Sequence, residues 1–496
     1  MLHYTLNHIL EIFNFNQYLI TLFLLMIIPK VVTLILTQLS ASTSSPVFLL
    51  NFTCYKPRKD STQKALTRKM VVEKARKYGV TYSKETVDFM EKILEKSGLG
   101  DETYFPEAVV VDELTYPTMQ KAVEESQEVI FGVVEDLLAI TKVNTADIGI
   151  VVVNCSVFNV VPSLSAMVVN KFKLRDDVRS YNITGMGCSA GLRCIGLANN
   201  LLKVHKDMLA LVVSTENITD NCYMGNDLSM IGPNCYFRVG GAAMLLTNRS
   251  IDRSHAKYQL VHYVDIQTAS SDCSYNSITH QEDECGFRGI AASKDFVVSA
   301  TEAVQSNIDA LGRLVLPVHE ITLYAVHCIT RRLFMSGKKA YAPNLKGQFD
   351  HFLPHVGGKM VLDALEKKLG MNKTQIEASR MTLYRFGNTS SSSIWYELAY
   401  VEAKGRVGIN DRVWQIAMGS GFKCSSVVWL AMRNVEIRTH RNAIIKRKTK
   451  NKDTGNYTGS DPGDPTPVEK RGDSLLIKLM MVQYKNHTHE TTYQIL

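Results

Sequence analysis

Cys188 stands in the run Gly-Met-Gly-Cys-Ser-Ala-Gly, residues 185–191, which combines a nucleophile with small flanking residues. Glycines on both sides permit a sharp turn and let a ligand approach the backbone closely. A mostly apolar helix is expected from Ser189 to about His205, so the thiol lies at a helix N-terminus, where backbone amides lower its pKa. A thiolate in this place attacks thioesters, and the same amides can hold an oxyanion. We therefore predict that Cys188 accepts an acyl group.

Two polar residues of the second half could assist this cysteine. His355 lies in the run His-Val-Gly-Gly, whose glycines give a ligand access to the imidazole. Asn388 follows Gly387 in a second small-residue turn that is expected to enter a helix. A cysteine, a histidine and an asparagine can bind a thioester and stabilise an enolate without a metal or redox cofactor. His351 would lie one turn before His355 in a helix, but Pro354 argues against a helix there.

Alternating helices and strands are expected to position these residues. The pattern predicts a helix over 119–137, strands at 148–154, 209–214 and 242–246, and then a strand at 323–326, a helix at 360–365 and a strand at 413–417. This alternation indicates an α/β class with layered helices and sheets. The two small-residue turns indicate a duplicated fold, with one half at 56–250 and the other at 251–436.

Residues 1–55 are expected to form an N-terminal membrane anchor. Residues 12–29 and 31–55 carry no charge, and about 20 apolar residues suffice to cross a bilayer. One span over 18–36 and a short hairpin around Lys30 both fit. A cleaved signal peptide, with Ser40-Ala-Ser42 near the cut, is an alternative, but no Lys or Arg precedes the apolar run. Six basic residues between 56 and 69 predict that the catalytic part faces the cytosol.

Composition excludes several other classes of protein. The 496 residues carry a formal charge of +8, and much of the basic excess follows the apolar segment or lies near the C-terminus, without any nucleic-acid-binding motif. None of the ten cysteines has CxxC spacing, which argues against a zinc ribbon or redox pair and favours reduced thiols. Residues 437–496 are charged or Gly/Pro-rich and aperiodic, which predicts a disordered tail.

From about residue 52 to 435 the chain resembles the plant-type 3-ketoacyl-CoA synthases, the condensing enzymes of very-long-chain fatty acid elongation. The resemblance rests on Tyr55-Lys-Pro, Gly100-Asp-Glu-Thr-Tyr-Phe-Pro-Glu107, Asp147-Ile-Gly-Ile-Val-Val-Val-Asn-Cys-Ser156, Pro162-Ser-Leu-Ser-Ala-Met167, the Cys188 run, Phe237-Arg-Val-Gly-Gly-Ala-Ala243, residues 385–400 and Gly419-Ser-Gly-Phe-Lys-Cys424. It implies a thiolase-like duplicated αβαβα layered fold on the endoplasmic reticulum membrane.

The same resemblance implies roles for individual residues. The family's nucleophile falls on Cys188, its histidine on His355 and its asparagine on Asn388, and a further family histidine falls on His351. The implied reaction is a decarboxylative Claisen condensation of malonyl-CoA with an acyl-CoA, with backbone amides near Cys188 and Gly421 holding the oxyanion and no cofactor beyond the substrates. The implied partners are the bilayer, a second copy in a homodimer and other enzymes of an elongase complex.

Several departures from the family pattern bear on activity. The family's usual Asn-Trp-Tyr and Asp-Arg-Ser runs read Asn221-Cys-Tyr223 and Asp227-Leu-Ser229 in this chain. Tyr384 stands where many relatives carry a histidine, and Gln267 stands at another histidine position. Tyr384 still offers a hydroxyl, and both residues are candidates for supporting roles. These departures motivate an alternative hypothesis, a weakly active or inactive homologue that acts as a dimer partner or scaffold in the elongase complex. A soluble polyketide synthase of the same fold is a further alternative, which the N-terminal apolar segment disfavours.

Overall fold

The computed structural model describes residues 46–58, 60–77, 81–110, 118–334, 341 and 343–435. Most of the expected anchor, residues 1–45, and the expected tail, residues 437–496, lie outside the described residues. Within these ranges the structure contains no helix that is both long and apolar enough to cross a bilayer.

Five strands form the first half of a nine-stranded mixed sheet, in the order β1-β7-β6-β4-β5. Their bounds are β1 Phe48–Cys54, β4 Ile148–Asn154, β5 Arg179–Ile183, β6 Leu209–Thr215 and β7 Gly241–Thr247. β4 pairs in parallel with β5 and β6, whereas β7 runs antiparallel to β6 and β1. β4, β6 and β7 are buried along their whole length, which confirms the strands expected from three continuous apolar runs.

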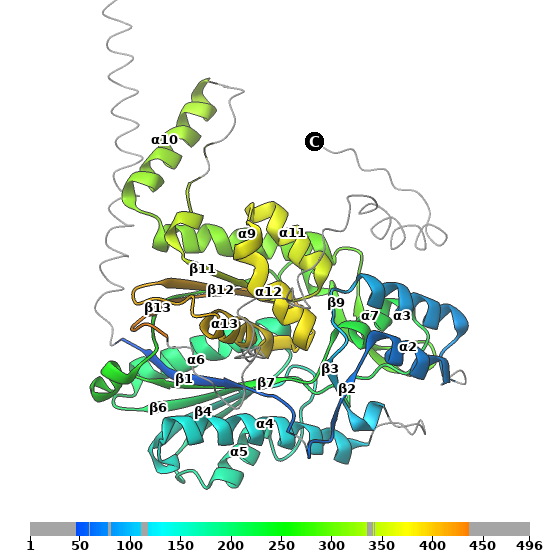
Figure 1. Ribbon diagram of the computed structural model, residues 1–496. Coiled ribbons are helices and arrows are strands. Elements are labelled where there is room, and N and C mark those ends of the chain that lie inside the picture. Colours follow the sequence, from blue (N-terminus) through cyan, green and yellow to red (C-terminus); the bar gives the residue numbers. More distant parts are fainter. Residues whose placement is uncertain are drawn as a thin grey trace, which may run out of the picture.

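Four strands form the second half, in the order β8-β13-β12-β11. Their bounds are β8 Tyr258–Gln267, β11 His351–Pro354, β12 Arg412–Gly419 and β13 Lys423–Ala431. β1 and β8 join the halves by pairing only Phe48 with Gln259 and Leu49 with Tyr258. The two halves therefore lie as separate layers, one above the other in Figure 1.

Helices fill three layers around the two half-sheets. α4 (Met119–Thr141) and α5 (Leu164–Phe172) cover the outer face of the first half, and α9 (Phe296–Val315) covers that of the second. α6 (Ala190–Val204) and α13 (Ser393–Ala403) contact strands of both halves and lie between them (Figure 1). The helices and sheets thus alternate in five layers.

The two central helices are apolar on nearly every side, as a helix between two sheets must be. On α6 the buried side chains include Leu192, Ile195 and Leu202, and on α13 they include Trp395 and Leu398. Both helices begin inside the molecule, so the residues at their first turns face a buried space.

Smaller elements pack around the layers. They are β2 Gln63–Leu66, α2 Arg68–Lys77, α3 Lys84–Lys96, β3 Thr103–Pro106, α7 Leu228–Tyr236, α8 Asp272–Tyr275, β9 Ile278–Glu282, β10 Arg288–Ala292, α11 Lys359–Leu369 and α12 Lys373–Phe386. α2, α3 and α7 pack on one another, and α7 also packs on β10.

The structure corrects the expected boundary between the membrane anchor and the first half of the fold. Residues 48–54, assigned to the anchor because they are uncharged and apolar, form β1 in the middle of the sheet. A short apolar run suits a buried strand as well as the end of a membrane segment, so sequence pattern alone does not separate the two. The first half of the fold therefore begins before residue 56.

Two local predictions of secondary structure are also corrected. Residues 323–326 lie in helix α10 (Val318–Phe334), where Leu323 and Tyr324 are exposed instead of buried in a strand. Four apolar residues are too few to distinguish the two periodicities. The stretch around His351 and Pro354 is strand β11 and not a helical turn.

Trp395 should be among the residues on which stability depends most. Its side chain is fully buried and packs between the rings of Phe52 and Trp429. Trp395→Ala should lower the free energy of unfolding by about 3–5 kcal/mol, because it opens a cavity between the two sheets. Denaturant unfolding followed by circular dichroism measures this change. Ile251→Ala, at a side chain 75% exposed, should shift the unfolding free energy by less than about 0.5 kcal/mol.

Candidate active site

Cys188 lies in the 3-10 turn Gly187–Ser189 that leads directly into α6. Gly185 and Gly187 adopt φ of +68° and +59°, which residues with a Cβ rarely do. A Cβ at Gly187 would lie 2.6 Å from the backbone nitrogen of Ser420, in the turn between β12 and β13. The predicted glycine-shaped turn is confirmed, and the close contact with a second turn explains why glycine is needed.

Asn388 lies at the matching entrance of α13. Gly387 before it adopts φ of +71°, and the Asn388 N–H donates to the carbonyl of Tyr236 at 3.0 Å. The side-chain oxygen of Asn388 accepts from the Ser390 N–H at 2.8 Å, and its amide donates toward the Cys188 thiol. The side-chain amide of Asn388 is thereby fixed in orientation next to the nucleophile.

The two helix entrances touch backbone to backbone. A Cβ at Gly191 would lie 2.4 Å from the Ser391 carbonyl oxygen. Asn154, at the end of β4, donates to the Ser391 hydroxyl at 2.7 Å and accepts from the Ser214 hydroxyl at 2.7 Å. Residues about 200 positions apart in sequence are thereby brought together at the ends of β4 and β6.

His355 follows β11 and is only 1% exposed. Its backbone N–H donates to the Ile416 carbonyl at 2.9 Å, but neither ring nitrogen has a hydrogen-bond partner among the described residues. Burial lowers the pKa of His355 to about 4, so the imidazole is neutral at pH 7. An unpaired buried polar group costs about 1–3 kcal/mol, which marks the ring as a group arranged to bind something other than protein.

Burial also shifts the pKa of the nucleophile. It raises the pKa of the Cys188 thiol to about 12, and the nearby charge of Glu216 adds to the effect. Hydrogen bonds from Ser390, the Cys188 backbone N–H and Asn388 lower this pKa, but their combined effect is smaller than that of burial. The expectation of a lowered thiol pKa is therefore wrong, because lost hydration outweighs the amides of the helix N-terminus. Cys188 is a thiol at neutral pH and needs a base during acylation.

Glu216 is a functional candidate that the sequence analysis missed. This buried carboxylate accepts from the backbone N–H groups of Ser156 at 3.1 Å and Val157 at 3.2 Å, and from the Ser390 hydroxyl at 3.0 Å. The Ser390 hydroxyl lies 3.7 Å from the Cys188 sulfur, so it connects the carboxylate to the nucleophile. Burial raises the pKa of Glu216. An acidic residue two positions after the apolar run 209–214 was the signal available in the sequence.

Cys188, His355 and Asn388 line one cavity of about 1780 Å³. This volume exceeds the 300–1,000 Å³ typical of small-molecule sites. Much of the remaining wall is apolar and comes from α2, α3, α9 and α11, including Val71, Phe89, Met90, Ile93, Val304, Val361 and Leu365. Within the described ranges no cluster of His, Cys, Asp or Glu could hold a metal ion. The cavity thus joins a polar reactive end to a long apolar space.

The other predicted site residues lie away from the cavity wall. His351 pairs with Asp411 at 2.9 Å, at the opposite end of β11 from His355. Tyr384 lies on α12 and is 38% exposed, and Gln267 is exposed at the end of β8. These three side chains do not line the cavity, so the structure gives no direct contact by which they would support Cys188, His355 and Asn388. Gly421 stands in the turn between β12 and β13, with φ of +97°.

Comparison with known proteins agrees with this geometry. A family model described as FAE1/Type III polyketide synthase-like protein matches residues 39–333, and one described as 3-oxoacyl-[acyl-carrier-protein] synthase III C terminal matches residues 344–430. Among similar proteins of Arabidopsis thaliana, 3-ketoacyl-CoA synthase 9 is 50% identical over 79% of this chain and 75% of its own length. This chain belongs to the 3-ketoacyl-CoA synthase family. A second relative, 3-ketoacyl-CoA synthase 16, is 51% identical over 80% of both chains.

A solved structure supports the fold of this 3-ketoacyl-CoA synthase family member. A point mutant of CsyB superimposes with a TM-score of 0.60 over 78% of this chain and all of that chain. The sequences are only 15% identical, so this likeness concerns the fold alone. Together with the family models it confirms the predicted thiolase-like α/β fold. The family model and the 3-ketoacyl-CoA synthase relatives place the chain among condensing acyltransferases.

The raised pKa of Cys188 predicts an unusual alkylation profile. The thiolate is the reactive form, so the rate of carbamidomethylation at Cys188 should rise about tenfold per pH unit from pH 7 to 10 without levelling off. Peptide mass spectrometry after timed iodoacetamide pulses measures it, with the exposed Cys273 and Cys285 peptides correcting for loss of reagent. A plateau below pH 9 would contradict the burial argument.

The neutral His355 predicts a specific loss of stability in acid. Its pKa is lower in the folded state than in the unfolded chain, so its stabilising effect is present above pH 6.5 and is lost as the pH falls toward 4. Between pH 7 and 4 the unfolding free energy of the wild type should fall about 2–3 kcal/mol further than that of His355→Gln. Urea unfolding at both pH values tests this, and equal losses in the two proteins would show that burial does not lower the pKa of His355.

Proposed function

We propose that this chain is a 3-ketoacyl-CoA synthase that condenses malonyl-CoA with a long-chain acyl-CoA in very-long-chain fatty acid elongation. One observation carries the proposal. A buried imidazole, whose two ring nitrogens have no partner within the described part of the chain, shares a large, partly apolar cavity with a fixed carboxamide and a thiol. The imidazole and carboxamide suit a thioester oxygen, the thiol suits acyl transfer, and the apolar wall suits a fatty chain.

Acylation comes first in this proposal. The Cys188 sulfur attacks the acyl-CoA carbonyl, and the bond between that carbon and the CoA sulfur breaks. His355, neutral at pH 7, accepts the thiol proton and passes it to the departing CoA thiolate. Backbone N–H groups of Cys188 and Gly421 receive the negative charge that develops on the acyl oxygen.

Condensation follows with malonyl-CoA in place of the first CoA ester. His355 and Asn388 donate hydrogen bonds to its thioester oxygen, and this stabilises the enolate that forms when the carboxylate leaves as CO2. The enolate carbon attacks the acyl carbon on Cys188. The bond to the Cys188 sulfur breaks, 3-ketoacyl-CoA forms, and the released thiolate takes a proton from solvent. These steps use no metal or redox cofactor.

We extend the proposal to the surroundings of the enzyme. An uncharged N-terminal stretch followed by basic residues supports anchorage in the endoplasmic reticulum membrane, through one span or two, with the catalytic part facing the cytosol. Long acyl-CoA substrates partition to such a membrane. A homodimer and contacts with other elongase enzymes are proposed from the family resemblance alone.

The departures that motivated the scaffold alternative lie in two places. Tyr384 and Gln267 lie off the cavity wall, whereas Cys222 and Leu228 line the cavity together with Cys188, His355 and Asn388. The complete trio favours the enzyme proposal over the scaffold.

Two half-reactions test the proposed function. Membranes that contain the full chain should release CO2 from malonyl-CoA and CoA from a long-chain acyl-CoA. His355→Ala and Asn388→Ala should each slow CO2 release about 10²- to 10³-fold, because each removes a donor to the enolate. Cys188→Ala should abolish CoA release and acyl labelling of the protein.

The exposed Cys285→Ala variant serves as the matched control and should retain both half-reactions. Equal rates for the wild type and Cys188→Ala, with no acyl group on Cys188, would overturn the enzyme proposal and favour the scaffold.

A further inference from the structure

Helix α7 runs along the cavity from the reactive centre outward. The carbonyl of Tyr236, the last residue of α7, accepts the Asn388 N–H at 3.0 Å, so this end of the helix lies at the reactive centre. Leu228, Gly232 and Tyr236 all line the cavity, and their regular spacing places them on one face of the helix. With a rise of about 1.5 Å per residue, Gly232 lies about 6 Å and Leu228 about 12 Å along the axis from Tyr236.

Gly232 leaves an opening in this face of α7. Glycine destabilises a helix interior relative to alanine, so its presence calls for an explanation. It has no left-handed φ. Apart from its own helix backbone and chain neighbours, an added Cβ would have no heavy atom within 4 Å among the described residues. At Gly187 and Gly419, which also line the cavity, a Cβ would come within 2.6 Å of other atoms. The missing side chain at Gly232 therefore enlarges the cavity instead of permitting a backbone contact.

A second small residue lies in the loop beside α7. Asn234 of α7 joins the helix to this loop: its side-chain oxygen accepts the Tyr223 N–H at 3.1 Å, and its amide donates to the Tyr223 carbonyl at 2.7 Å. Cys222, next to Tyr223, lines the same cavity. The family's usual runs carry a tryptophan at the position of Cys222 and an arginine at that of Leu228. The cavity wall around α7 is therefore built from smaller and less polar side chains than the family pattern implies.

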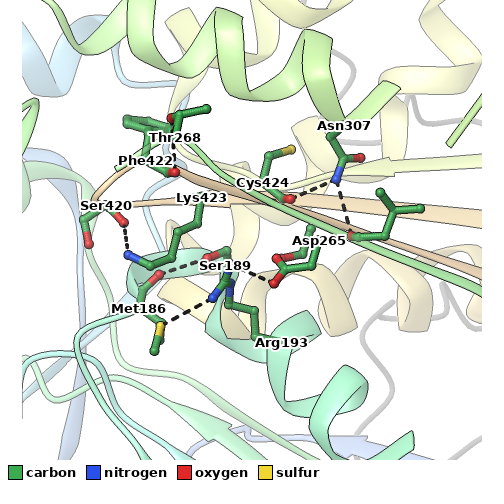
Figure 2. Close-up of polar contacts among 12 residues, drawn as sticks. Met186, Ser189, Arg193, Asp265, Thr268, Asn307, Ser420, Phe422, Lys423 and Cys424 are labelled. Carbon is green, nitrogen blue, oxygen red and sulfur yellow. Dashed lines mark hydrogen bonds and ion pairs between the residues drawn. The ribbon is translucent and has the colours of Figure 1, made fainter. Parts of the chain in front are cut away.

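The remaining walls of the cavity include apolar helices that are fixed in place. α3 packs on α7 and contributes Phe89 to the wall, and α9 contributes Phe296. Asn307 holds α9 on the sheet, since its amide donates to the Cys424 carbonyl of β13 at 2.8 Å and to the Val264 carbonyl of β8 at 3.4 Å (Figure 2). An apolar space with fixed walls suits a hydrocarbon chain, whose burial is favourable.

We propose that the acyl chain lies along α7 and that the open position at Gly232, together with Cys222 and Leu228, sets how long and how bulky a chain the site accepts. Gly232 is then a specificity-determining residue that takes no part in bond formation. The substrate class is a long, uncharged hydrocarbon chain that continues past Gly232. A chain too short to reach this position gains nothing from the opening. This inference rests on the proposed function.

Gly232→Leu tests the proposal because it fills the opening with a branched apolar side chain. CoA release by membranes that contain the full chain is measured with hexanoyl-CoA, palmitoyl-CoA and lignoceroyl-CoA. The ratio of kcat/KM for palmitoyl-CoA to that for hexanoyl-CoA should fall about 10- to 100-fold, because the longer chain meets the new side chain. The loss for lignoceroyl-CoA should be at least as large. CO2 release from malonyl-CoA alone should change less than about threefold, since no long chain is bound.

Two further variants separate lost volume from other effects. Gly232→Ala adds a Cβ before Pro233 without filling the opening, so the same ratio should fall less than about threefold. Val204→Leu is the control away from the cavity: Val204 ends α6, is 74% exposed and does not line the cavity, so the ratio should be that of the wild type.

An unchanged ratio in folded Gly232→Leu would overturn the proposal. Equal losses for all three acyl esters and for malonyl-CoA would also overturn it, because the space along α7 would then hold the CoA arm that these substrates share. If Gly232→Leu does not fold, Cys222→Trp fills the space from the neighbouring loop and should lower the same ratio; an unchanged ratio there would count against the proposal. A wild-type protein that releases neither CoA nor CO2 would instead refute the proposed function.

Discussion

The contact between the first turns of α6 and α13 is the constraint on which the rest of the site depends. Gly191 has no side chain, and this allows the Ser391 carbonyl to approach to a distance that any Cβ would block. Asn154 and Ser214 then tie Ser391 to the ends of β4 and β6. Both central helices must therefore start at the same place, and Cys188 and Asn388 meet there because each stands at such a start.

Burial of that meeting point sets its chemistry. Removal of water keeps His355 neutral and Cys188 protonated, and it raises the pKa of Glu216. A neutral imidazole can both accept a proton from a thiol and donate its own N–H to an oxygen. The same low-polarity surroundings strengthen every hydrogen bond offered to a developing charge. Protonation states that look unfavourable for a nucleophile are thus consistent with a site that activates it only during reaction.

Different parts of the chain contribute different residues to the site. The first half brings the nucleophile, β11 of the second half brings His355, and the turn between β12 and β13 closes the space behind Cys188. The smaller helices α2, α3 and α11 add the apolar wall. Sequence identity with the Arabidopsis relatives is near 50%, whereas CsyB shares the fold with only 15% sequence identity.

The sequence by itself determined the reactive cysteine, the histidine and asparagine beside glycines, and most central strands, because these depend on local composition and periodicity. It misassigned residues 48–54 and 323–326, since short apolar runs suit more than one environment. Only the tertiary structure decided that His351, Tyr384 and Gln267 lie off the cavity and that Glu216 and Ser390 line it beside Cys188. It also reversed the expected direction of the Cys188 pKa shift. Contacts across some 200 residues and the extent of burial are properties of the packed chain, and no local pattern encodes them.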